Sequence, residues 1–384
     1  MADEICNNYL FTIFSEQAAA KKIILYVSLL LLQMIASPIQ AGFSDFYCRK
    51  KSLVVSLSCS CLSLIFAFIF EINLFISGFI FVLMIFAKGG LGNTLPLSLA
   101  GVSDTQSSNV RFSFGMCTAA MASGYLALIL LEKLFRFDKL VIMLILIFII
   151  LIIICAKSFK DIRDKEGPSP HQHSSRSRLE MLKHDFNLVK EEISMIINEL
   201  SHKRTRKALT TFLLWEISLY SIHMLDVDLQ IDKFYNLTTS MVLGYLIGIY
   251  LLKKLNKLTD KKMISIGYKT CIFSVIPFFI LFPLLNDSRY LMLFCYFFYN
   301  MGTVFLAPSL FSTLANERKP HEQGKMFGLL ESTDTVSFLF AAIAAIFYNI
   351  SRLPAIYIVS FSFLTFLASW VPYDRFNKLK PRHF

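Results

Sequence analysis

Residues 140–156 read LVIMLILIFIILIIICA and are uncharged throughout. At about 1.5 Å of rise per residue, a helix of this length comes close to spanning a hydrocarbon core of roughly 30 Å. In lipid, backbone polar groups must be paired internally, so only helices and closed barrels cross it. The run is too long and too uniformly apolar for a barrel strand. It therefore predicts a transmembrane helix.

The rest of the chain repeats this pattern. Of its 384 residues 55% are hydrophobic and 17% charged, and the mean hydropathy is +0.58, more apolar than a soluble globule of this size. The sequence predicts an all-α polytopic membrane protein. The expected spans lie near residues 23–43, 53–70, 73–100, 112–134, 138–156, 207–228, 234–253, 262–284, 289–314, 325–349 and 353–372.

Matching residues recur at a nearly constant offset, which predicts two pseudo-repeated six-helix halves. The matches are Asp45 with Asn256, Lys88 and Pro96 with Asn300 and Pro308, and Phe114-Gly115 with Phe327-Gly328. Internal repeats of this kind are typical of secondary transporters. We expect an N-terminal half over 1–156, a central loop over 157–206 and a C-terminal half over 207–384. Residues 1–17 match 212–228, so the first helix is expected to be incomplete, giving 11 to 12 transmembrane helices.

Positive charge predicts the orientation in the membrane. Most of the 38 lysines and arginines lie in alternate loops, including the central loop and the C-terminal tail. By the positive-inside rule these segments are cytoplasmic, in the cell (inner) membrane. The net charge of +11 is thus a topology signal, and we expect no nucleic-acid partner.

Between the first two strong spans lies AGFSDFYCRKKSL, residues 41–53. Its order of acid and bases resembles the loop motif G-x-L-x-D-R-x-G-R-[RK]-x-x-L of the major facilitator superfamily, with Asp45, Arg49 and Lys50 in the charged places. Lys88 and Gly92 are similar to the family's fourth-helix pattern R-x-x-x-G. The resemblance implies two six-helix halves that transport a solute by alternating access.

The charged hinge predicts a cytoplasmic gate. Asp45 at the end of one helix can pair with Arg49 and Lys50 and with neighbouring helix ends, and such a pair can hold that side shut. The matching loop adds Asn256 and Lys261. Alternatively, the bases only contact phospholipid headgroups.

Polar residues inside spans predict the solute and proton pathway, because ionisable groups in the membrane are costly. Glu216, Tyr220 and His223 are spaced i, i+4, i+7 on one helical face, and Trp215 or Tyr220 could stack on a solute. The alternative for Glu216 is a structural pair with Lys88.

A second set of candidates lies in other spans. Glu331 and Asp334 share a face near the cytoplasmic end of the eleventh helix, where they could line the pathway. Alternatively, they balance the positive charges of the nearby Arg318, Lys319 and Lys325. Lys88 and its repeat partner Asn300 lie deeper, as pathway or structural residues.

The central loop contains one regular element. Apolar residues recur with alternating steps of three and four over about residues 178–200, which predicts an amphipathic helix. It is expected to lie on the headgroups or brace the two halves; a coiled-coil dimer is the alternative.

These features favour a secondary transporter of a small polar solute, such as an amino acid or another organic ion, with proton coupling. An enzyme is not expected, because the sequence contains no nucleotide-binding loop, zinc motif or nucleophile turn. We expect a monomer in the lipid bilayer, without cofactor or metal. The alternative function is a non-transporting or degenerate relative acting as a receptor or sensor.

Overall fold

The computed structural model describes residues 19–46, 48–72, 83, 86–105, 110–134, 137–158, 190, 193–194, 196–224, 231–285, 289–316, 323–351 and 355–377. The incomplete first helix predicted over residues 1–17 and most of the central loop lie outside these residues. All regular elements of the described part are helical.

In the N-terminal part the elements are α2 (Ala19–Phe46), α3 (Arg49–Ile72), the π-helical turn η3 (Phe86–Leu91), α5 (Thr94–Thr105), α6 (Val110–Leu134) and α7 (Phe137–Ser158). In the C-terminal part they are α9 (Lys203–Met224), α10 (Ile231–Lys254), α11 (Asp260–Leu285), α12 (Arg289–Ala315), α13 (Gln323–Ser351) and α14 (Ala355–Asn377). Their order follows the predicted spans.

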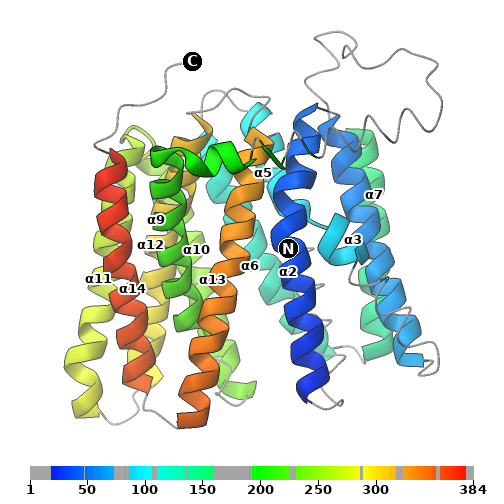
Figure 1. Cartoon of the computed structure of the whole chain (residues 1–384). Coiled ribbons are helices and arrows are strands. Elements are labelled where there is room, and N and C mark those ends of the chain that lie inside the picture. Colours follow the sequence, from blue (N-terminus) through cyan, green and yellow to red (C-terminus); the bar gives the residue numbers. More distant parts are fainter. Residues whose placement is uncertain are drawn as a thin grey trace, which may run out of the picture.

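The long helices stand side by side, with α13 next to α2 in the middle of the bundle (Figure 1). Two apolar clusters form the interior. The smaller joins α2, α3, α5 and α7; the larger joins the C-terminal helices and also takes in Phe114 and Ala119 of α6. The helix α6 therefore crosses from the first predicted half to pack on the second.

Within the described residues, four helices are both long and apolar enough to cross a membrane. They are Val27–Asp45, Lys139–Ser158, Leu293–Ala315 and Gln323–Ala344. Among the other predicted spans, α9 contains more polar residues, since it opens with KRTRK and contains Glu216. Such polar residues point to helices that face one another within the bundle, not lipid alone.

The predicted continuous span over 73–100 is wrong in its described part. The π-turn η3 ends at Leu91, Gly92 and Asn93 are not helical, and α5 begins at Thr94. At this break Pro96 has no N–H to give the Gly92 carbonyl four residues earlier. In the other repeat, Pro308 lies inside a continuous α12.

The seam between the halves runs along α2 and α13. Pro38 lies inside α2, so the carbonyl of Met34 has no backbone donor. Ser332 of α13 supplies it, with its hydroxyl donating to the Met34 oxygen at 2.6 Å. One step along, Gln33 donates to Glu331 at 2.9 Å. A backbone defect in one half is thus repaired by the other.

Glycines on α13 permit this close approach. A Cβ added at Gly324 would lie 2.3 Å from the Ala41 oxygen, and one at Gly328 would lie 2.5 Å from the Pro38 Cα. Both contacts are with backbone, which cannot turn away as a side chain can. Only glycine, which has no Cβ, therefore fits at these two positions of the seam.

The predicted amphipathic helix is only partly covered. Residues 196–201 are helical, and the segment before α9 lies across the end of the bundle at the top of Figure 1. Ile196 is buried against the C-terminal cluster, whereas Ile193, Ile197 and Leu200 are exposed. This end of the segment contacts the C-terminal half, as a brace would; the part before residue 190 lies outside the described residues.

Gly328→Ala is expected to lower stability by about 1–3 kcal/mol, since the added methyl group overpacks the seam and must push α13 from α2. Thermal unfolding of purified protein in detergent should show a melting temperature lower by roughly 2–10 °C. Gly90→Ala is the control, because its Cβ would meet only the Leu32 Cδ2 at 3.8 Å. Equal effects of the two substitutions would contradict the packing argument.

Candidate functional site: two clasps and a polar seam

Asp45 joins the two halves at the end of α2. Its two carboxylate oxygens accept from the backbone N–H groups of Gly324 and Lys325, both at 2.9 Å, at the start of α13. The first N–H groups of a helix lack partners within it, and the helix dipole favours a negative charge there. The side chain of Asp45 is fully buried. An acid of the N-terminal half therefore caps a helix of the C-terminal half.

Arg49 holds this acid in place. Its guanidinium lies 2.7 Å from the Asp45 carboxylate, also forms an ion pair with Asp104 at the end of α5, and donates to the Ser44 hydroxyl at 3.0 Å. We call Asp45, Arg49, Asp104 and the start of α13 the first clasp. The sequence predicted that Asp45 would meet Arg49 and a helix end; it missed Asp104, although an acid just past a predicted span is a visible signal.

A second clasp joins the halves through Arg111 at the start of α6. Its guanidinium donates to the carbonyls of Asn256 at 2.7 Å and Leu258 at 2.8 Å, and pairs with Asp260 at 2.8 Å. Asp260 also accepts from the Ser312 hydroxyl at 2.9 Å. Here a base of the N-terminal half bonds backbone carbonyls of the loop that joins α10 to α11 in the C-terminal half.

The two clasps occupy matching positions of the repeat with opposite charge. Arg111 matches Gly324, Asp260 matches Arg49 and Asn256 matches Asp45 at the offsets seen in the sequence. Lys261, predicted for this gate, has an exposed side chain, and its carbonyl accepts from the Tyr373 hydroxyl at 3.5 Å. Lys50 is half-buried beside the first clasp.

Two acids of α13 lie deeper along the seam. Glu331 accepts from Gln33 of α2 at 2.9 Å, and Asp334 accepts from the Tyr220 hydroxyl of α9 at 2.8 Å. At about 1.5 Å per residue, Asp334 lies roughly 16 Å from the start of α13, a helix of 29 residues. Its predicted place near the helix end was therefore wrong, and the structure pairs it with another predicted site residue.

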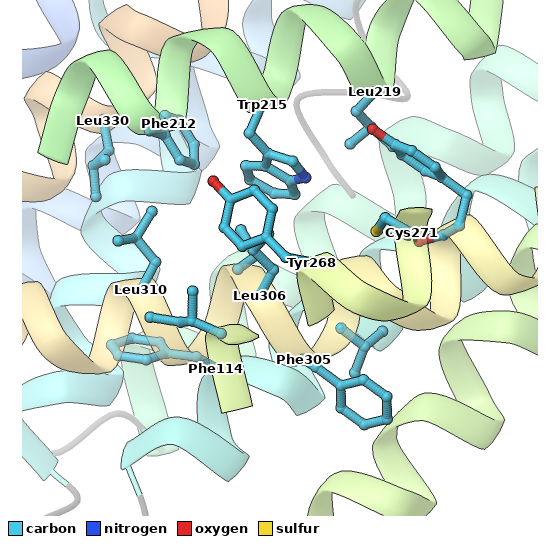
Figure 2. Close-up of a cluster of buried hydrophobic side chains, with 14 of the residues drawn as sticks. Phe114, Phe212, Trp215, Leu219, Tyr268, Cys271, Phe305, Leu306, Leu310 and Leu330 are labelled. Carbon is cyan, nitrogen blue, oxygen red and sulfur yellow. Dashed lines mark hydrogen bonds between the residues drawn. The ribbon is translucent and has the colours of Figure 1, made fainter. Parts of the chain in front are cut away.

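The remaining candidates on α9 separate. Glu216 is buried and close enough to Tyr299 to act on it electrostatically. Trp215 lies in the apolar core with Phe212 and Tyr268 (Figure 2). It packs the C-terminal half in this structure. His223 belongs to α9, but its side chain lies outside the described part.

Lys88 is fully buried, and its ammonium donates to the Gly92 carbonyl at 3.2 Å. The same oxygen accepts from the Ser60 hydroxyl at 2.9 Å. This is the carbonyl that Pro96 leaves without a donor. Lys88 therefore has a structural role, one of the two alternatives left open by the sequence, but its partner was not predicted. The spacing Lys-x-x-x-Gly-x-x-x-Pro could have indicated it.

Asn300, the repeat partner of Lys88, is also fully buried. It donates to the Tyr296 carbonyl at 2.7 Å, and its amide oxygen accepts no hydrogen bond within the described part of the chain. The two matching residues thus bond backbone in opposite directions, Lys88 forward along the chain and Asn300 backward.

Membrane-length helices, two clasped halves and carboxylates along the seam are the features of a polytopic membrane transporter. Comparison with known families agrees, since a model of the Major Facilitator Superfamily matches residues 16–342. The chain belongs to the major facilitator superfamily.

Solved structures share the fold at low identity. A bacterial homologue of the iron transporter ferroportin, in the outward-facing state, is 12% identical with a TM-score of 0.68, covering 98% of this chain and 96% of its own. The E. coli fucose:proton symporter is 11% identical with a TM-score of 0.67, and the match covers 98% of this chain and 96% of the symporter. A proton:xylose symporter is 12% identical with a TM-score of 0.64, and the match covers 97% of this chain and 93% of that protein. Among curated protein sequences none matches the chain. At these identities the structures establish the fold alone.

Lys88→Met should cost roughly 1–3 kcal/mol, because the buried Gly92 carbonyl loses one of its two donors. In a Pro96→Ala background the new N–H can serve that carbonyl, so the same substitution should cost less. Melting temperatures and denaturant midpoints of the four proteins should give a coupling free energy of about 1 kcal/mol or more. Strictly additive effects would show that Pro96 and Lys88 are unconnected.

Reversing the charge of the second clasp should open it. Arg111→Glu places an acid beside Asp260 and two carbonyls, so thermal stability should fall. Adding Asp260→Arg should restore part of the loss, since the ion pair returns while the carbonyl contacts do not. Lys257→Glu on the same exposed loop is the control. No recovery in the double variant would argue against the pair.

Proposed function

We propose that this protein is a secondary transporter that moves a small polar solute, an amino acid or another organic ion, by alternating access. The observation that carries the proposal is the buried Gln33–Glu331 hydrogen bond, which joins the two halves inside the bundle. Burying a carboxylate at the seam costs free energy, and an apolar side chain could pack there without that cost. Such a group is expected where the seam opens to bind a solute.

The clasps supply the gate in this proposal. Both join the halves near one end of the bundle, and both depend on charged groups whose partners belong to the other half. Rocking of the halves, 1–156 against 207–384, would break these contacts together at the side we expect to be cytoplasmic. The contacts of Glu331 and Asp334 would then become available to a solute.

Proton coupling is the second element of the proposal, and Glu216 is the candidate carrier. It is buried on α9, the helix that also presents Tyr220 to Asp334. An acid shielded from water on a mobile element can take up and release a proton as its surroundings change. We place the protein in the inner membrane as a monomer, with its central loop and C-terminus in the cytoplasm.

The test is uptake of a radiolabelled amino-acid mixture into proteoliposomes, with and without an inward proton gradient. We expect uptake that the gradient stimulates several-fold, and no stimulation in Glu216→Gln, because an amide cannot carry the proton. Asp374→Asn, near the end of α14 and away from the seam, should keep the response.

Outcomes separate the parts of the proposal. Uptake that ignores the gradient in both proteins would remove proton coupling but keep transport. An unchanged gradient response in Glu216→Gln would remove Glu216 as the carrier. Absence of uptake across amino acids, sugars and organic ions would favour a receptor-like protein.

A further inference from the structure

The broken span is surrounded by oxygen atoms. η3 packs between α2 and α3, and side chains of those helices bond its last carbonyl and the carbonyl of the residue that follows it. Gln40 of α2 donates to the Leu91 oxygen at 2.5 Å, and Ser60 of α3 donates to the Gly92 oxygen at 2.9 Å. Carbonyl oxygens of unwound membrane helices are ligands for small cations in transporters.

Two further oxygens lie at the break. The amide nitrogen of Asn93, a fully buried residue, donates to the Gly89 carbonyl at 3.3 Å, so its amide oxygen is held next to the same backbone. That oxygen and the amide oxygen of Gln40 are buried and accept no hydrogen bond in the described part of the chain. The break therefore holds more acceptors than donors.

One positive charge lies at the break. The Lys88 ammonium is fully buried and donates to the Gly92 carbonyl at 3.2 Å, a contact that links the first turn of the break to its last. An ammonium group needs the same surroundings as a monovalent cation that has lost its hydration shell. Both need several oxygen atoms whose lone pairs point toward the charge.

We propose that the break between α2, α3 and α5 is a site for a monovalent cation, and that the Lys88 ammonium is its resident cation. The Gly92 carbonyl bonds the ammonium. The Ser60 hydroxyl, which shares that carbonyl, and the amide oxygens of Asn93 and Gln40 are the further ligands that a free cation would take. Because this cation is tethered, the wild-type protein is expected to need no sodium in order to fold.

The experiment compares two substitutions of Lys88 in purified protein. Lys88→Ala removes the ammonium and leaves its space, so sodium can enter; Lys88→Met fills the space with an apolar chain. Melting temperatures are measured in sodium chloride and in N-methyl-D-glucamine chloride at equal ionic strength. Sodium should raise the melting temperature of Lys88→Ala by at least about 2 °C, saturably, because only the native state binds it.

Wild type and Lys88→Met should show no difference between the two salts. Adding Ser60→Ala to Lys88→Ala should reduce the sodium response, because one ligand is lost. If Lys88→Ala is recovered folded only when sodium is present throughout, the proposal is supported. If no cation allows it to fold, or if all three proteins respond equally, a small cation does not replace the ammonium and the proposal fails.

Stability is the readout, so this result is independent of transport. A sodium response in Lys88→Ala without any uptake by wild type would keep the cation site and reject the proposed function. Uptake by wild type without a sodium response in Lys88→Ala would do the reverse.

Discussion

Backbone N–H and C=O groups that water cannot reach must find partners within the protein, and most of the charged contacts described end on a backbone group that lacks a helical partner. Asp45 accepts from the first N–H groups of α13, Arg111 donates to carbonyls beyond the end of α10, and Lys88 donates to a carbonyl that a proline has stripped. In each case charge is used first to complete backbone hydrogen bonding. Two of these three contacts also join the halves, so the same bonds that satisfy helix ends hold the bundle in this conformation.

The two clasps lie at matching positions of the repeat, but the charges of their residues are reversed. The first clasp sets a carboxylate against N–H groups, which the helix dipole strengthens, and it is buried. The second sets a guanidinium against carbonyls and an acid that is partly exposed. Exposed ion pairs are screened by salt more than buried ones. The two clasps therefore differ in strength although symmetry places them alike, and the second is the one that ionic strength can weaken.

Periodicity and hydropathy predicted the order and approximate ends of the described helices, apart from the broken span over 73–100, because lipid allows few structures other than long apolar helices. The partners of charged residues were harder to predict. Asp45 occupies the acidic position of a motif, so its contact with a helix end could be predicted. The Tyr220–Asp334 and Gln33–Glu331 hydrogen bonds join residues over a hundred positions apart and could not. Spacing shows which residues share a face of one helix, but not which helix lies opposite. Trp215 illustrates this limit, since it packs in the core, whereas Tyr220, five residues later on α9, reaches Asp334 at the seam.

The break at Gly92 and Asn93 gives the two halves different mechanics. Its backbone groups are already bonded to Gln40, Ser60 and Lys88, so η3 and α5 can change their relative angle without losing a helical hydrogen bond. The matching helix α12 is continuous from Arg289 to Ala315 and would have to break such bonds to bend. One half is therefore jointed and the other stiff, and strain applied along the bundle axis would be taken up on the N-terminal side.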